Sequence, residues 1–207
     1  MAEGVHFFWL SWMFWVIAAC FMPHSRRNTL VKVWILAAIA TANTYLIVGQ
    51  LTLSATLMIL LTGAFLLITK TYATYLNLFT AFTVMIVYDC ILIWEHEVPM
   101  WLIMPKSLFL PLIIVTIILY VAKGLMKRVA IAVVGVCGGD LFYGVMLSSY
   151  HIPYTAGSKA FLDDFVVIVA VIICLQILHE MYSYGMKLLH KHTTAPAILE
   201  QRKKDAR

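Results

Sequence analysis

The sequence predicts an all-α fold, a polytopic transmembrane helical bundle with seven spans. The first observation is the composition: 63% of the 207 residues are hydrophobic, 12% are charged, and the mean hydropathy is +0.92. A soluble core of this size would need more polar surface, so lipid is expected to cover the remainder. The second observation is a series of apolar stretches of about 20 residues, the length that crosses a bilayer as a helix.

The predicted spans are seven, and their boundaries are defined to within a few residues. They cover residues 6–22, 30–48, 51–69, 75–94, 98–123, 129–150 and 164–185. One alternative stays open for the fifth, in which residues 98–104 lie flat at the interface and Pro105 starts a shorter helix. The chain still crosses seven times in that alternative, because the shorter helix just reaches across.

Basic residues set the orientation, which is the third observation. Of the 15 Lys and Arg residues, all but Lys106 and Lys159 follow the first, third, fifth or last span, on one side of the membrane. The positive-inside rule makes that side cytoplasmic, so the amino terminus lies outside and the carboxyl terminus inside. The net charge of +5 therefore indicates orientation rather than nucleic-acid binding. We expect a multi-pass membrane protein.

The sequence predicts one membrane domain, residues 1–189, followed by a short basic cytoplasmic tail, residues 190–207. No Lys or Arg precedes the first span, so residues 1–22 are expected to remain as a helix rather than to be cleaved as a signal, with processing at Cys20 as the alternative. All four cysteines fall in apolar spans, which predicts buried thiols rather than disulfides or a metal site.

An intramembrane ion pair is predicted between Asp89 and Lys106. A carboxylate in hydrocarbon costs about 2.5–3.5 kcal/mol or more unless it is paired, protonated or facing water. The two residues lie at similar distances before and after the turn near residue 97, so an antiparallel hairpin would bring them to the same depth. The pair could do no more than fix the register of two helices.

Asp140 is the second costly carboxylate, and no basic residue shares its span. Gly135 and Gly139 precede it as a GxxxG motif, which lets a neighbouring helix approach closely. Two interpretations stay open: a proton- or cation-binding carboxylate assisted by Gln176, or a neutral carboxyl that donates one hydrogen bond. The predicted acceptors for that bond are Asn43, Thr44, Tyr88 and Gln176.

Other polar residues give no complete site. His179-Glu180 lacks the second histidine of a zinc-protease HExxH motif, because position 183 is Ser183. A group on the outer side is interpreted as solvated loop charges in preference to a metal site: Glu95, His96, Glu97, His151, Asp163 and Asp164. The aromatic residues near them are interpreted as interfacial anchors: Tyr143, Tyr150, Tyr154, Trp94 and Trp101. No catalytic residue, metal or cofactor is predicted.

Three segments carry a family resemblance. They are the aromatic opening Phe7-Phe8-Trp9-Leu10-Ser11-Trp12 leading to Phe21-Met22-Pro23, the run Gly139-Asp140-Leu141-Phe142-Tyr143-Gly144, and the later Phe161-Leu162-Asp163-Asp164. With them the chain resembles the small YphA-type membrane proteins of Bacillus-like spore-forming bacteria. The resemblance implies a polytopic inner-membrane protein without an assigned activity, and it supplies no catalytic residues.

The sequence therefore leaves two functions open. The first is a non-enzymatic protein that acts by association with other membrane components, either a partner protein or a second copy of itself. The second is a small carrier or channel for a proton, a cation or a small solute, centred on Asp140 with help from Asp89, Lys106 and Gln176. A water-filled cavity that reaches Asp140 would favour transport, whereas a packed carboxyl would favour association.

Overall fold

The computed structural model describes residues 4–21, 26–49, 51–69, 74–97 and 106–204 of the chain. It divides into two compact units, Met1–Ile172 and Ile173–Arg207, which we describe separately. The first unit contains the helical bundle and a small sheet, and the second contains the rest of the last helix.

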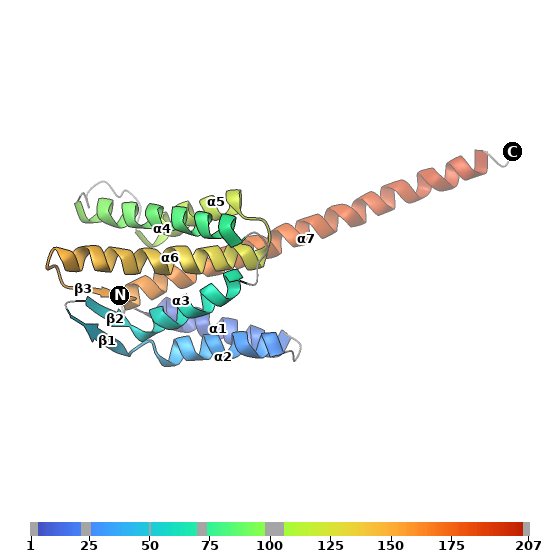
Figure 1. Ribbon diagram of the computed structural model, residues 1–207. Coiled ribbons are helices and arrows are strands. Elements are labelled where there is room, and N and C mark those ends of the chain that lie inside the picture. The colour runs from blue at the N-terminus through green and yellow to red at the C-terminus, as the bar shows by residue number, and fades with distance from the viewer. Residues whose placement is uncertain (1–3, 22–25, 50, 70–73, 98–105, 205–207) are drawn as a thin grey trace. The chain divides into compact units, whose positions relative to one another are not determined.

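Helices dominate the described residues, and three short strands accompany them (Figure 1). The helices are α1 (Val5–Phe21), α2 (Arg26–Ala40), α3 (Ala55–Thr69), α4 (Thr74–Glu97), α5 (Lys106–Val121), α6 (Leu125–Ser149) and α7 (Lys159–Lys204). The strands are β1 (Tyr45–Val48), β2 (Leu51–Ser54) and β3 (Tyr154–Ala156). Within the first unit, successive helices run in alternating directions (Figure 1).

The strands correct the all-α prediction. The predicted span 30–48 ends as a helix at Ala40 and continues as β1, and the predicted span 51–69 begins as β2 before α3. Aromatic and branched side chains favour a strand in this stretch, and Gly49, at φ 66°, allows the tight turn between the strands. An apolar run alone cannot distinguish a buried helix from two short strands. For this reason the apolar stretches on either side of Gly49 were predicted to be entirely helical.

The sheet joins distant parts of the chain. β1 and β2 pair antiparallel as a hairpin, and β3, about 100 residues later, pairs parallel with β2. Leu51 lies opposite Tyr154 and Leu53 opposite Ala156 in that parallel register. The Thr52 hydroxyl hydrogen-bonds with the Tyr154 carbonyl oxygen at 3.0 Å and with the Thr155 hydroxyl at 2.7 Å. The residues between α6 and α7 are thereby fixed to the α2–α3 connection.

Helix α6 is the centre of the bundle and the most buried of the long helices. It packs against α4 through the two glycines of the GxxxG motif. A Cβ atom at Gly135 would lie 2.7 Å from a Val84 methyl, and one at Gly139 would lie 2.7 Å from the Tyr88 ring. Such distances leave no room for a side chain, so the motif brings two helices of the same chain together.

Within the part of the chain that the structure describes, three helices are long and apolar enough to cross a membrane: Tyr75–Glu95, Leu125–Ser149 and Lys159–Tyr184. The other apolar helices are shorter, covering Val5–Phe21, Asn28–Ala40, Ala55–Leu66 and Phe109–Val121. Helix α5 begins at Lys106, as in the alternative with the shorter fifth helix, and residues 98–105 lie outside the described part of the chain. Helix α7 continues past the predicted tail boundary to Lys204.

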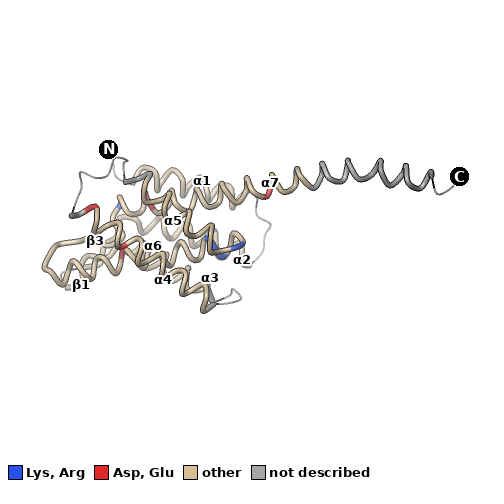
Figure 2. Tube along the Cα trace, turned by 90° about the horizontal axis from the view of Figure 1, so that it is seen from above, with Lys and Arg blue, Asp and Glu red and all other residues tan. Residues whose placement is uncertain are grey.

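Most of the basic residues with described side chains lie at one end of the bundle. Figure 2 shows Lys and Arg beside α2, at the opposite end from β3, and a further basic position on the β3 side, where Lys159 begins α7. Lys32 lies close to the start of α2, and Lys127 and Arg128 lie in the first turn of α6. The Arg128 guanidinium donates to the Ala122 carbonyl oxygen at 2.9 Å, and so contacts the end of α5.

Candidate functional site

The candidate site is built around Asp140 of α6, whose side chain is completely buried. Its Oδ1 atom accepts a hydrogen bond of 2.7 Å from the Tyr154 hydroxyl. Its Oδ2 atom accepts one of 2.5 Å from the backbone N–H of Gly157. Both donors lie in the connection from Tyr150 to Ser158, which we call the strap. Asp140 thus holds the strap against the central helix by both carboxyl oxygens.

Local sequence explains why the strap turns back onto α6. His151 and Gly157 adopt the left-handed region, at φ 61° and 77°, so the chain reverses after Ser149 and bends again before α7. Gly144 leaves room on α6 for the strap, because a Cβ there would lie 3.1 Å from the Tyr154 ring and 3.2 Å from Ala156. The rings of Tyr154 and Tyr143 pack edge to face, with centroids 5.1 Å apart.

Depth explains why the strap needs a carboxylate. Asp140 precedes the last residue of α6 by nine positions, so it lies about 13 Å along the helix from that end. The strap therefore brings non-helical backbone well inside the bundle, among apolar side chains. Each unpaired backbone group there would cost several kcal/mol, and irregular backbone at membrane depth is tolerated only where protein or water satisfies it. Asp140 satisfies the Gly157 N–H.

Tyr154 is suited to donate a lasting hydrogen bond. Burial, and then the adjacent Asp140 charge, raise the pKa of the Tyr154 phenol well above its ordinary value of 10.0. The phenol therefore stays protonated in the folded protein. Its stabilising effect is fully present below the pKa of an unfolded tyrosine and is lost as the pH rises above it.

The observed donors to Asp140 differ from the predicted partners. Tyr154 was interpreted as an interfacial anchor, and backbone donors such as Gly157 were not considered. The carboxyl accepts both bonds, whereas the prediction had it donate. The sequence signal for these donors was the short connection between α6 and α7. It contains a tyrosine and a glycine, and glycine allows the turn that brings the connection back onto Asp140.

The four predicted hydrogen-bond partners of Asp140 lie in different parts of the structure. Asn43 is exposed at the end of α2, and the Thr44 hydroxyl donates to the Thr41 carbonyl oxygen at 2.7 Å. Tyr88 lies in the core against Gly139. Gln176 belongs to the second unit, where its side-chain amide donates to Glu180 at 2.9 Å. A role for Gln176 beside Asp140 therefore stays a prediction.

Asp89 is buried on α4, and among the described residues its Oδ1 atom has no hydrogen-bond partner. Its predicted partner Lys106 begins α5, but the Lys106 side chain lies outside the described part of the structure. Helix α5 packs against α4. The Asp89–Lys106 ion pair stays a prediction, and the open side of the Asp89 carboxyl is a reason to test it.

A double-mutant cycle tests this pair. If Asp89 and Lys106 pair, either Asp89→Asn or Lys106→Gln strands a poorly hydrated charge, which we expect to cost about 3–5 kcal/mol of unfolding free energy. The double variant should lose less than the sum of the two single losses. Denaturant unfolding in detergent micelles measures all four proteins, and additive losses would refute the pair.

Asp163 performs a function that the sequence reasoning missed. It was interpreted as a solvated loop charge, yet its Oδ2 atom accepts a hydrogen bond of 2.8 Å from the Gly4 N–H and its Oδ1 atom accepts one of 2.7 Å from Phe7. These donors are free N–H groups at the start of α1, so a residue of α7 caps α1. The His6 Nδ1 atom lies 3.8 Å from Asp163 Oδ2. The neighbouring Asp164 is buried.

Loss of this cap should weaken the attachment of α1. Replacing Asp163 with Ala removes both acceptors, and we expect a loss of about 0.5–2 kcal/mol of unfolding free energy. Hydrogen exchange of the amides of residues 4–8 should increase in the variant. His6→Gln is the matched control, because the His6 side chain is largely exposed and should contribute little. Equal effects of the two substitutions would contradict the capping role.

The cysteines and the possible metal ligands form no second candidate site in the part of the chain that the structure describes. Cys137 is buried, but Cys20, Cys90 and Cys174 are exposed on their helices, which corrects the prediction of four buried thiols. The prediction failed because an apolar span places side chains toward lipid as readily as toward the core. Among the described residues, no three His, Cys, Asp or Glu side chains gather so that they could hold a metal ion.

Comparison with known proteins agrees with the helical, apolar architecture. No curated protein matches the sequence significantly, and no solved structure does. The model of one family, described as YphA-like integral membrane protein, matches residues 3–196, which is nearly the whole chain. This confirms the resemblance seen in the sequence and establishes that the chain is embedded in a lipid bilayer. The chain therefore belongs to the YphA-like integral membrane protein family.

Proposed function

We propose that this protein is a non-enzymatic protein of the bacterial cytoplasmic membrane that acts through association with other membrane components. The observation that carries the proposal is the packing of Asp140. Its side chain is completely buried, and each oxygen accepts a hydrogen bond from the strap. A carboxylate used in this way holds the fold together, and it is not presented to a substrate or a solute.

A second carboxylate with described partners, which is only partly buried, supports the same interpretation. Asp163 binds two backbone N–H groups of α1, so its charge also serves to join segments. The sequence contains no complete HExxH, nucleophile-elbow or P-loop motif. Much of the exposed surface is formed by large apolar side chains, including Trp9 on α1, Phe79 on α4 and Tyr120 on α5. Such a surface meets lipid or another membrane protein.

We further propose that all seven helices cross the membrane, with the amino terminus outside. The alternating helix directions and the basic residues at the end opposite β3 support this topology (Figures 1 and 2). The short helices α2 and α3 would be completed at the outer side by β1 and β2. Reporter fusions after residues 24, 72 and 204 should report the cytoplasm, and fusions after residues 49 and 152 the outside. Any reversed reporter would refute the topology.

Site-specific photo-cross-linking in native membranes tests the association. A photoreactive amino acid at exposed Trp9, Phe79 or Tyr120 samples three different helices. We expect a defined protein adduct from one helix and none from the others, because a specific interface covers one face. Lipid adducts from all three positions, with no protein adduct, would refute association at these faces.

Transport is the competing function, and one measurement separates it. Purified protein in proteoliposomes should show no proton or cation flux above that of empty liposomes. A flux that Asp140→Asn abolishes, while the variant remains folded, would instead establish a carrier centred on Asp140.

A further inference from the structure

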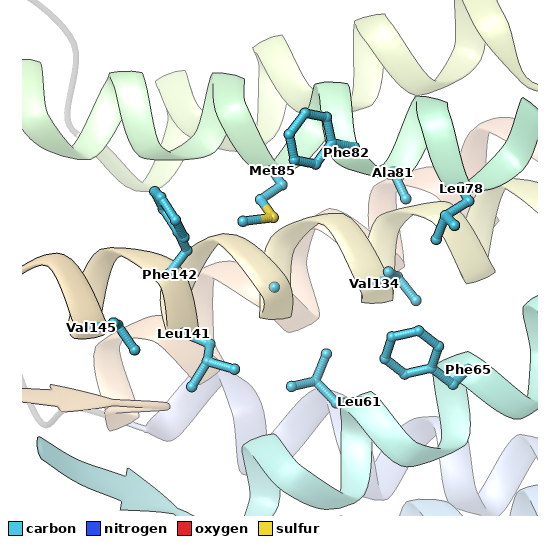
Figure 3. Close-up of a pocket in the computed structure, with 11 residues that line it drawn as sticks. Leu61, Phe65, Leu78, Ala81, Phe82, Met85, Val134, Leu141, Phe142 and Val145 are labelled. Carbon is cyan, nitrogen blue, oxygen red and sulfur yellow. The ribbon is translucent and has the colours of Figure 1, made fainter.

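A groove of about 520 Å³ runs along α6 between α3 and α4 (Figure 3). Its floor is formed by one stripe of α6, which includes Val134, Gly138 and Leu141, and its walls are formed by side chains of α3 and α4. All the residues that line it are apolar. It lies within the first unit and does not include Asp140, so it is separate from the candidate site described above.

The rim of the groove is continuous with the lipid-facing surface. Phe65, Phe82 and Phe142 stand at its edges and are each about half exposed. Family membership places this chain in a bilayer, and Phe82 and Phe142 lie on α4 and α6, which are long and apolar enough to span it, so their exposed rings face hydrocarbon. The groove therefore opens sideways into lipid.

The dimensions of the groove indicate which kind of molecule can occupy it. From Val134 to Val145 it follows α6 for 11 positions, or about 17 Å, close to half of the roughly 30 Å hydrocarbon core. A helix about 10 Å wide would occupy about 1,300 Å³ over that length, which exceeds the roughly 1020 Å³ of empty space in the groove with its open side included, so a partner helix could not enter it fully. One extended hydrocarbon chain fits.

We propose that this groove binds a single acyl chain of a membrane lipid, aligned along α6. Contact with three helices gives the chain more dispersion partners than it has in bulk lipid, which makes the site preferred over the rest of the surface. This proposal does not depend on the proposed association, because it needs no protein partner.

Gly138 offers a way to block the groove without disturbing the bundle. A Cβ atom at Gly138 would contact only the Met85 sulfur, at 3.6 Å, which is an ordinary van der Waals distance. At Gly135 and Gly139 it would instead clash with α4. Gly138→Leu therefore fills the floor, and Gly138→Ala is the matched control that leaves it open. Val145→Trp, at an exposed rim position, blocks the groove independently.

The test uses the full chain in phosphatidylglycerol vesicles that contain a trace of phosphatidylglycerol with a diazirine in one acyl chain. After photolysis, peptides with Met85 and Phe142 should be labelled several-fold more than peptides with Leu112 and Tyr120, which are more exposed on α5. Gly138→Leu and Val145→Trp should reduce the labelling to the α5 level, and Gly138→Ala should keep it.

Two results would overturn the proposal. Equal labelling of the groove and of α5 would mean that lipid only coats the surface. Labelling that persists in both blocking variants would mean that the chain lies outside the groove. A failure of Gly138→Leu to fold leaves Val145→Trp to decide, and neither outcome depends on whether photo-cross-linking at Trp9, Phe79 or Tyr120 captures a partner.

Discussion

Replacing Asp140 with Ala is expected to release the strap and destabilise the protein more than removal of a surface charge would. The substitution leaves the Gly157 N–H and the Tyr154 hydroxyl in apolar surroundings without their shared acceptor. A buried polar group that loses its partner costs about 1–3 kcal/mol, so the two together should cost about 2–6 kcal/mol. Denaturant unfolding in detergent micelles measures the loss.

A graded series tests whether the loss arises from these two bonds. Tyr154→Phe removes one donor and keeps the ring, so it should cost about 0.5–1.5 kcal/mol, less than Asp140→Ala. Asp140→Asn keeps the shape but presents an N–H₂ group to one of the donors, and it should fall between the two. Amides of residues 152–157 should exchange faster in the same order. Unchanged exchange in Asp140→Ala would show that the strap is held by other contacts.

This series also distinguishes a structural carboxylate from a transport site. In a carrier, conservative Asp140→Asn would abolish flux and leave stability nearly unchanged. If Asp140 has only a structural role, as we propose, stability should fall in this variant and there should be no flux to lose. The free energy of unfolding and the proteoliposome flux are therefore to be measured on the same preparations.

Composition and hydropathy were sufficient to predict the membrane class, whereas the family was indicated by its resemblance to three short segments of the sequence. The three longest helices, α4, α6 and α7, overlap the predicted spans 75–94, 129–150 and 164–185, because each carries an unbroken apolar stretch. The glycines at 135 and 139 were expected to admit a neighbouring helix, and the structure shows α4 in that place. These features depend on local sequence, which is why pattern alone indicated them.

Long-range pairing could not be predicted in the same way. The sheet needs β3 to meet β2 across about 100 residues, and a three-residue strand has no periodicity to reveal it. Asp163 caps a helix more than 150 residues away in sequence. Polar residues near chain reversals were interpreted as solvated because most polar residues are exposed to water. Here apolar side chains surround them, and each carboxylate satisfies backbone N–H groups that would otherwise lack a hydrogen-bond acceptor.

Gly157→Ala gives the sharpest test of how tightly the strap is packed. Gly157 has φ 77°, and a Cβ atom there would lie 2.7 Å from Ser54 Cβ and 3.0 Å from Leu57 Cβ. Left-handed backbone costs a residue with a Cβ about 1–2 kcal/mol, and overpacking adds about 1–3 kcal/mol. The same residue donates to Asp140, so any shift that relieves the clash also weakens that bond. We expect a loss of about 2–5 kcal/mol.

Gly124→Ala is the matched control for this prediction. Gly124 has φ 95°, but nothing lies within 4 Å of a Cβ atom at that position. With ψ 137° it incurs backbone strain of about 1–3 kcal/mol without the clash. The difference between the two variants in unfolding free energy isolates the contact between the strap and the start of α3. Equal losses would mean that backbone strain alone explains the effect, and that the strap can move away from Ser54 without weakening its bond to Asp140.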